Sequence, residues 1–473
     1  MKKNYLVGLL FLAGTMFWSC SDDNDLGDVN RDAVLNKGTQ TEQVVYADEE
    51  GLKDEGIKFT TQGAWKAEVV EVSTRSVNAS AQTIDWLTLS QYSGDKAGDY
   101  TINLTLKQNF TGKSRKAEIR ILCGKTVITI SVEQKAEKED GIKLKRVKSV
   151  DYTILLGTEA NKQHEYYEDD NCTFTYSYDD QGRVAKVVQS WYDEESTYLF
   201  DYHIVGEITV NESNDNFDPS LPDNYKCEHL LTLNKQRNVE NIRSKTSDSN
   251  YKETNNKAAY NQDGRLAELS RDNSYESWNE KYFYTDGLLT KLERKVGMYD
   301  PDIYEFDVAK AYTNRYPANK ANIDFNAFFL FGDGGNSIEI TNLLSQIGLL
   351  GKGSDCLIET KTNDDDECEF INPDDENVYT EPDKVIKHTS KVIKYSKEKM
   401  FPVKYELDGD KYVTKFSYVE PYEVYEYYYE IHVGHELADP NYPYMGYKRA
   451  IKNEKWTKLS DEKNTFSYTV TYE

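Results

Sequence analysis

The feature that most restricts the fold of this chain is a recurring aromatic hairpin pattern. In its clearest copy, Phe and Tyr alternate with polar residues over 174–178, the turn Asp-Asp-Gln-Gly-Arg follows at 179–183, and an apolar run begins at Val184. Alternation places the aromatic side chains on one face of a strand, and Asp, Asn and Gly tolerate the positive φ of a tight reversal. Similar segments recur at 260–266, 282–288 and 405–410. The pattern predicts antiparallel hairpins.

These copies are unevenly spaced along the chain. A solenoid or propeller needs a fixed period, so an antiparallel meander fits the pattern better. The acidic turns also lack the D-x-[DN]-x-[DN]-G-x₅-E spacing of a calcium loop, so they predict chain reversals and no calcium site.

Composition adds limits on size and partners. A chain of 473 residues allows two or three domains, and 37 Tyr and 17 Phe supply the bulky side chains that strands favour. The fold class that we expect is therefore mainly β. With 57 Lys and Arg against 82 Asp and Glu, the net charge is −25, which repels phosphate backbones, so no nucleic-acid partner is expected.

Residues 1–20 have the plan of an export signal. Lys2 and Lys3 precede an apolar run that ends at Ser19 and Cys20 and is shorter than the roughly 20 residues of a spanning helix. The Cys and the acidic stretch after it resemble the signal of a surface lipoprotein of the Bacteroidetes. The resemblance implies a lipid on Cys20, a membrane partner through that anchor, and a surface-exposed place at the outer membrane. A signal cleaved without lipidation and a retained membrane helix are the alternatives.

The next segments predict a tether and a small sandwich. Residues 21–40 are rich in Asp, Asn, Gly and Thr, as in a flexible tether, whereas 41–136 contain short alternating runs such as 101–106 and 127–132. The order of Trp65, Trp86-Leu87-Thr88-Leu89-Ser90, Asn109, 115–119 and 130–134 resembles the BACON domain, an immunoglobulin-like module of Bacteroidetes surface proteins. The resemblance implies either carbohydrate binding or a spacer role, of which we favour the spacer.

Trp65 and Trp86 are the candidate ligand-binding residues of this sandwich. Aromatic faces suit the C–H faces of sugars, but a small sandwich also needs large aromatic side chains in its core. The core is the favoured place for both residues.

Residues 141–473 form the second, larger predicted domain, an antiparallel meander with one or two short helices. Its Tyr-rich hairpins and the segment 321–326, which precedes a hydrophobic stretch, resemble the DUF4595 group of Bacteroidetes lipoproteins; this implies an architecture and no activity. The main helical candidate is 322–350, with Gly351 as its stop. Alternating apolar residues from Phe466 to Tyr472 predict a paired last strand.

No arrangement of catalytic residues stands out. His432 and His435 with Glu436 lack the H-E-x-x-H spacing, and a strand would point the two His to opposite faces. Apart from Cys20, the Cys residues have no C-x-x-C spacing, which argues against zinc, although Cys356 and Cys368 could form a disulfide. We therefore expect no enzyme activity, no metal and no cofactor. The Cys residues after Cys20 are Cys123, Cys172, Cys227, Cys356 and Cys368.

The leading functional hypothesis is a lipid-anchored surface protein of the outer membrane that binds or adheres to a glycan or to a surface protein. The abundance of Tyr motivates it, because a Tyr ring joins a flat apolar face to a hydroxyl group. One alternative is a glycan-acting hydrolase with an unrecognised pair of carboxylates. Another is a purely structural component of the envelope.

Overall fold

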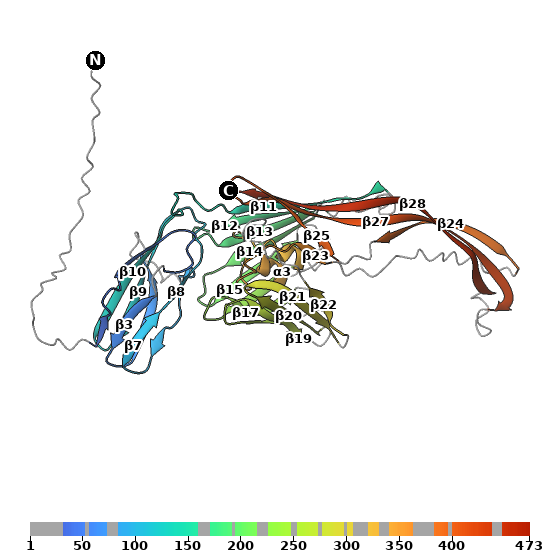
Figure 1. The fold of residues 1–473 in the computed structure, drawn as a ribbon. Helices are drawn as coiled ribbons and strands as arrows, with labels where there is room; N and C mark the ends of the chain where they lie inside the picture. Colours follow the sequence, from blue (N-terminus) through green and yellow to red (C-terminus); the bar gives the residue numbers. More distant parts are fainter. Residues whose placement is uncertain are drawn as a thin grey trace, which may run out of the picture.

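The computed structural model describes residues 32–52, 56–72, 84–158, 171–191, 194–214, 226–246, 253–272, 277–297, 300–305, 320–330, 340–362, 383–395, 400–437 and 447–473. Within these residues the chain is almost entirely strand, with two short helices (Figure 1). The expectation of a mainly β fold is confirmed.

The first ten strands form small sheets that face one another across a single apolar core. One sheet has the order β1-β3-β7, a second has the order β2-β10-β9-β4-β6, and β5 pairs with β8. Alternate residues of each strand point inward, so the core draws on all three sheets, and Trp65, Phe59 and Ile121 are among its most buried members. The strands are β1 (Ala33–Leu35), β2 (Glu42–Val45), β3 (Ile57–Thr61), β4 (Trp65–Glu71), β5 (Leu87–Leu89), β6 (Ser93–Gly94), β7 (Gly98–Ile102), β8 (Leu104–Leu106), β9 (Arg115–Cys123) and β10 (Thr126–Gln134).

Two details of this sandwich differ from the sequence analysis. The stretch 21–40 was predicted to be a tether, but β1 pairs with β3 and buries Ala33, so the packed structure already includes Ala33. The alternating run 101–106 is also split, because Asn103 separates β7 from β8, which belong to different sheets. Ile102, Leu104 and Leu106 nevertheless all point into the core, as their alternation predicts.

All the remaining described strands except β23 and β25 form one large sheet. Its order is β22-β21-β20-β19-β18-β17-β16-β15-β14-β13-β12-β11-β28-β27-β24, with β26 paired to β27, so a meander is closed by strands from the end of the chain. The strands are β11 (Val147–Leu155), β12 (Cys172–Tyr178), β13 (Val184–Trp191), β14 (Glu194–Asp201), β15 (Glu207–Asn214), β16 (Lys226–Leu233), β17 (Val239–Thr246), β18 (Thr254–Tyr260), β19 (Leu266–Asp272), β20 (Ser277–Thr285), β21 (Leu288–Val296), β22 (Asp302–Glu305), β24 (Val385–Tyr395), β26 (Lys404–Leu407), β27 (Val413–Leu437) and β28 (Tyr447–Tyr472); β23 (Thr360–Thr362) and β25 (Met400–Pro402) pair separately.

Four hairpin turns of this sheet share one geometry. The first turn residue is Asp or Asn, and its Oδ1 accepts hydrogen bonds from the backbone N–H groups two and four residues later; these residues are Asp179, Asn234, Asn261 and Asp408. The fourth turn residue has a positive φ, and these are Gly182, Arg237, Gly264 and Lys411. A fifth hairpin turns through Asp286 and Gly287, both with positive φ, as a tight two-residue reversal requires.

The four predicted hairpins are therefore all present. At 405–410 the residue with positive φ is Lys411, not Gly409, because the turn spans five residues. The hairpin at Asn234 was not predicted, since Arg237 replaces the Gly on which the pattern relied.

Tyrosines recur as hydrogen-bond donors at the same ends of these strands. Tyr178 at the end of β12 donates to the carbonyl oxygen of Val147 at the start of β11, at 2.6 Å. Equivalent bonds run from Tyr202 to Val184, from Tyr260 to Val239 and from Tyr472 to Val413. Burial raises the pKa of all four phenols. Some of the many Tyr residues therefore stabilise strand pairing, and their hydroxyl groups are not available for ligand contact.

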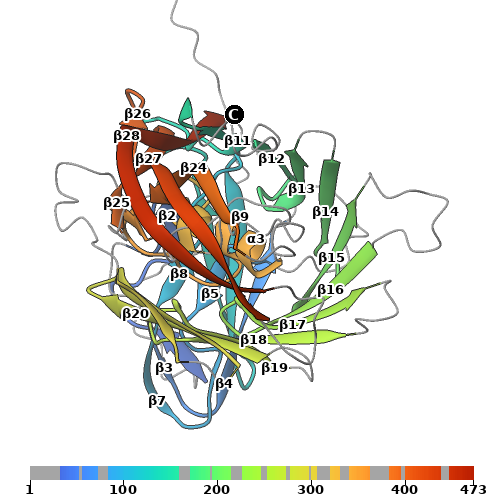
Figure 2. The same ribbon diagram turned by 90° about the vertical axis from the view of Figure 1, so that its right-hand side faces the viewer.

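The concave side of the large sheet is filled by helices and aromatic side chains. Figure 2 shows β12 to β20 curving around α3 (Ile340–Gln346), which lies near α2 (Ala327–Leu330). The predicted helix 322–350 is thus two short helices among the described residues, and α3 is followed by Gly348 at positive φ rather than by Gly351. Neither helix is long or apolar enough to cross a membrane, and the described residues contain no other helix that is.

Three strands extend well beyond the rest of the large sheet. Figure 1 shows β24, β27 and β28 projecting as a narrow ribbon. The end of β28 pairs with both β11 and β27, whereas residues 447–464 pair with β27 alone among the described strands. We call residues 385–395, 420–437 and 447–463 the arm.

Candidate functional site

The arm carries a continuous stack of aromatic rings, which we call the aromatic ladder. Strand alternation brings Tyr425, Tyr427 and Tyr429 to one face of β27, and the registers place Trp456 of β28 opposite Tyr427 and His388 of β24 opposite Tyr429. The ring centroids of Tyr427 and Trp456 lie 4.1 Å apart, those of Tyr427 and Tyr429 4.7 Å, and those of Tyr429 and His388 5.3 Å, all stacked. Tyr425 meets Trp456 edge-on at 6.0 Å.

Charged side chains border this ladder. The ammonium of Lys394 lies 3.8 Å from the ring centroid of Trp456 and 4.8 Å from that of Tyr425. The hydroxyl of Tyr427 donates to Glu454 at 2.8 Å, and burial together with this carboxylate raises the pKa of Tyr427 to about 12. Tyr425 likewise donates to Glu423 at 2.7 Å.

The exposure of the ladder changes along its length. Tyr427 and Tyr429 are buried, whereas Tyr425, Trp456 and Lys394 are half-buried and present partly accessible surface. The ring of Tyr427 and the ammonium of Lys394 already lie over Trp456, so the accessible parts of this patch are ring edges, the ammonium and the carboxylates. Such a patch can contact apolar groups of a ligand with its ring edges and hydrogen-bond to its polar groups. The run 425–431 is rich in Tyr and lies within β27, but nothing in the sequence indicates that Trp456 and His388 lie beside it.

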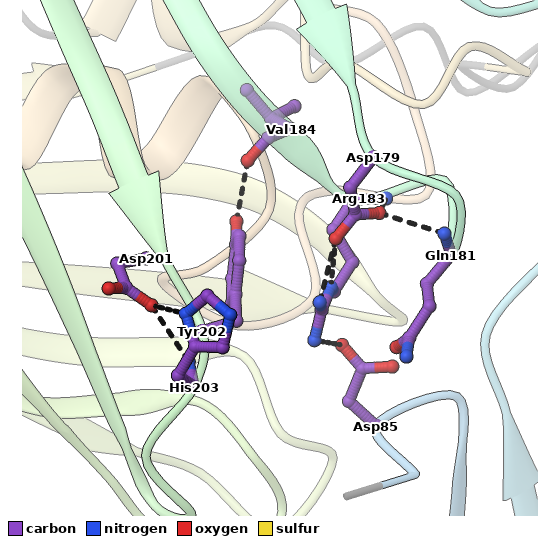
Figure 3. Close-up of polar contacts among 8 residues, drawn as sticks. All are labelled: Asp85, Asp179, Gln181, Arg183, Val184, Asp201, Tyr202 and His203. Atoms are coloured by element: carbon purple, nitrogen blue, oxygen red, sulfur yellow. Dashed lines mark hydrogen bonds and ion pairs between the residues drawn. The ribbon is translucent and has the colours of Figure 1, made fainter. Parts of the chain in front are cut away.

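A second candidate is a pocket at the junction of the sandwich and the large sheet. Arg183, in the turn after β12, lies 2.7 Å from the carboxylate of Asp179 and 3.6 Å from that of Asp85 of the sandwich (Figure 3). Its guanidinium also lies 4.2 Å from the ring centroid of Tyr202, whose hydroxyl is bound to Val184. Lys107, Glu207 and Arg237 also line the pocket.

The junction pocket is mainly a joint between the two parts of the chain. Of the cations that line it, Arg183 already contacts two carboxylates and an aromatic ring. Close packing supports the joint, because a Cβ on Gly182 would lie 2.8 Å from the Cγ2 of Thr111. Lys352 adds an ion pair with Glu50 at 3.8 Å. The arrangement holds the sandwich against the turns of the large sheet.

The structure places both candidate tryptophans of the sandwich in its core. Trp65 is 2% exposed and packs edge-on against Phe59 at 4.9 Å. Trp86 is 5% exposed, and the guanidinium of Arg115 lies over its ring at 4.6 Å from the ring centroid. Burial lowers the pKa of Arg115 to about 10. With so little ring surface accessible, we assign Trp65 and Trp86 to the core and not to a ligand-binding surface. The proposed lipid site, Cys20, lies outside the described residues.

The remaining sequence candidates do not form a site. His432 pairs with Glu430 at 3.2 Å, whereas His435 pairs with Asp383 at 2.7 Å, so the two imidazoles contact different carboxylates. Cys356 is buried, and its suggested disulfide partner Cys368 lies outside the described residues. Cys123 is buried in the sandwich core, as its position after an apolar run predicts.

Asp324 gives a prediction about pH. Burial raises the pKa of Asp324 to about 6, although its Oδ1 accepts a hydrogen bond from the backbone N–H of Asn326. Between about pH 4 and 6 the folded chain therefore retains a proton that the unfolded chain has lost, so the free energy of unfolding falls as pH rises through this window. Asp324→Asn keeps the acceptor oxygen and cannot ionise. We expect it to abolish this fall in the free energy of unfolding, which is on the order of 1–3 kcal/mol.

The measurement is urea unfolding of both proteins at pH 4 and pH 7. The difference in free energy of unfolding between Asp324→Asn and wild type should shift in favour of the variant from pH 4 to pH 7. The difference between Asp263→Asn, in an exposed turn, and wild type should not shift in this way. An equal pH dependence for wild type and Asp324→Asn would contradict the prediction.

Comparison with known families finds one match. Residues 74–135 match the family described as "BACON: Putative binding domain, N-terminal". These residues contain strands β5 to β10 of the sandwich. None of the curated proteins matches the chain.

Three solved structures show weak similarity. A porin-like protein from Bacteroides uniformis is 13% identical, with 69% of this chain and 98% of that chain covered and a TM-score of 0.39. A Bacteroides ovatus GH5 xyloglucanase in complex with an XXXG heptasaccharide is 20% identical, with 22% and 18% covered and a TM-score of 0.17. The TcdB2-TccC3-Cdc42 structure is 10% identical, with 81% and 22% covered and a TM-score of 0.19. These TM-scores are too low to show a common fold. The family match covers residues 74–135 and concerns this part of the sandwich only.

Proposed function

We propose that this chain is a lipid-anchored protein of the outer cell surface that binds glycans through the aromatic ladder of its arm. The lipid would be attached to Cys20, residues 41–136 would act as a spacer, and residues 141–473, with their resemblance to the DUF4595 group, would form the binding unit. Residues 74–135 match a family described as a binding domain, but both candidate tryptophans of this sandwich are buried, so we place the glycan contact in the arm.

The observation that carries the proposal is the aromatic ladder itself. Trp456, Tyr425 and Lys394 are partly accessible, and they lie on a ribbon that extends beyond the body of the sheet (Figure 1). Tyr and Trp are enriched at binding surfaces because each joins a large apolar ring to a polar tip. Because Trp65 and Trp86 of the sandwich are buried, we expect the glycan to contact the arm and not the sandwich.

A glycan array tests this proposal with matched variants. We expect the purified chain to bind a subset of polysaccharides and Trp456→Ala to weaken this binding at least about tenfold, or about 1.4 kcal/mol. Trp278→Ala is the control, because Trp278 is also half-buried and lies beneath an arginine, but belongs to β20 and not to the arm.

The outcomes separate the alternatives. Equal losses in Trp456→Ala and Trp278→Ala, or no binding to any glycan, would contradict glycan binding by the arm. Release of new reducing ends from a bound polysaccharide would instead favour a hydrolase. Capture of a single envelope protein without glycan binding would favour the structural role.

A further inference from the structure

A cluster of three metal-ligating side chains lies within the large sheet, outside the arm and the junction pocket. Glu212 on β15 is paired directly with Cys227 on β16, and His229 lies two residues further along β16. Because alternate residues of a strand share a face, these three side chains point to the same side of the sheet. Val210, the strand partner of His229, belongs to the buried core, so that side is the inner one.

The distances within the cluster are short. Nε2 of His229 lies 3.0 Å from Oε2 of Glu212, Nδ1 lies 3.8 Å from Sγ of Cys227, and Nδ1 also lies 2.7 Å from Oγ of Ser244 on β17. One ligand atom from each of Glu212, Cys227 and His229 lies within 4.8 Å of the other two. Ligand atoms around a tetrahedral zinc ion are about 3.3–3.8 Å apart. One ion can be bound by only one of the two imidazole nitrogens, so His229 would give up its present hydrogen bond at that nitrogen. Because one ligand atom from each of the three residues already lies within 4.8 Å of the others, side-chain shifts of about 1 Å would close the cluster on an ion.

Burial and charge favour an ion of this kind. His229 and Cys227 are each 4% exposed, and the Glu212 side chain is 11% exposed. A divalent ion bound by a carboxylate, a thiolate and a neutral imidazole leaves no net charge in this buried place. A mixed oxygen, sulfur and nitrogen donor set suits zinc and related transition metals, and does not suit calcium or magnesium, which prefer oxygen ligands.

We propose that Glu212, Cys227 and His229 bind one divalent ion of the zinc class, with water or the hydroxyl of Ser244 in the fourth position. Three protein ligands and one further position are typical of zinc sites that keep an open coordination position. The ion ties β15 to β16 at the cross-strand pair Glu212 and Cys227. Among the described residues, no other group of three or more such side chains is brought together in this way.

Cobalt titration of the purified, reduced full-length chain tests the site. We expect one equivalent of Co²⁺ to produce a near-ultraviolet thiolate-to-cobalt charge-transfer band and tetrahedral visible bands, both abolished by excess Zn²⁺. Cys227→Ser should lose the charge-transfer band, and His229→Gln should bind at least about tenfold more weakly. Cys172→Ser should keep the band, since Cys172 is also a buried free thiol but belongs to β12.

The wild-type chain also gives a result that needs no substitution. Saturating Zn²⁺ should raise its Tm, because an ion that binds only the folded state stabilises it. The proposal is overturned if the wild type gives neither a stoichiometric cobalt band nor a zinc-dependent Tm. It is also overturned if the band persists undiminished in a Cys227→Ser variant with wild-type circular dichroism, because another thiol would then bind the metal. After either result, the remaining role of Glu212, His229 and Ser244 would be the hydrogen bonds that link these three side chains.

Discussion

Removing residues 466–473 is expected to abolish cooperative folding of the large sheet. These residues are the end of β28, which pairs with β11 on one side and with β27 on the other. The truncation removes Tyr468 and Val470, which are 4% and 5% exposed, and so uncovers the core against which they pack. It also removes the hydrogen bond from Tyr472 to the carbonyl oxygen of Val413. Each such buried side chain contributes about 1.5–3 kcal/mol, and the lost backbone bonds add to this, against a total stability of about 5–15 kcal/mol.

Thermal unfolding followed by circular dichroism, with limited proteolysis, measures this effect. The truncated chain should lose its cooperative transition from the large sheet and be cleaved readily between 147 and 437. The control is a full-length chain with Thr469→Ala and Thr471→Ala, at exposed positions of the same strand, which should retain the transition. A truncated chain with an unchanged Tm would show that β28 does not hold the two halves of the sheet together.

The second large effect is expected for Phe416→Ala, at the centre of the concave aromatic core. Phe416 is fully buried and stacks on Tyr468 at 4.5 Å, with the rings of Phe325 and Phe329 at 5.5 Å and 5.4 Å. Its truncation removes contacts with β28 and α2 at once and leaves a cavity between rigid elements. We expect a loss of about 3–5 kcal/mol in the free energy of unfolding.

Urea unfolding of the two proteins gives this difference directly. Phe283→Ala on β20 is the matched control, because Phe283 is 40% exposed and its removal leaves no enclosed cavity. Its cost should stay below about 1 kcal/mol. Similar losses for Phe416→Ala and Phe283→Ala would mean that the aromatic cluster is not the centre of the core.

The hairpins could be predicted from the sequence because their causes are local. Asp179 and Asn261 bind the backbone of their own turns, and Gly182 and Gly264 supply the positive φ, so a few adjacent residues specify each reversal. The hairpin at Asn234 was missed because Arg237 adopts the same positive φ without being Gly. The side chain of Asn234, which binds the backbone as Asp179 does, was the signal that could have revealed it.

The sites could not be predicted in the same way, because they depend on strand register. Trp456 meets Tyr427 only because β28 folds back along β27 with several bulges, which shift the register by amounts that no local pattern shows. Glu212 lies opposite Cys227 because of the register between β15 and β16, which no local sequence pattern predicts. The spacing of Cys227 and His229 was visible and places both on one strand face, but it identifies only two of the three ligands.

The proposed function depends on the chain being held at the cell surface by a lipid on Cys20. Mass spectrometry of the N-terminal peptide from protein isolated out of native membranes tests this most directly. We predict that the mature chain begins at Cys20 and carries the added mass of acyl chains. A peptide that begins at Met1, or a Cys20 without any added lipid mass, would contradict the anchor and with it the proposed display of the arm outside the cell.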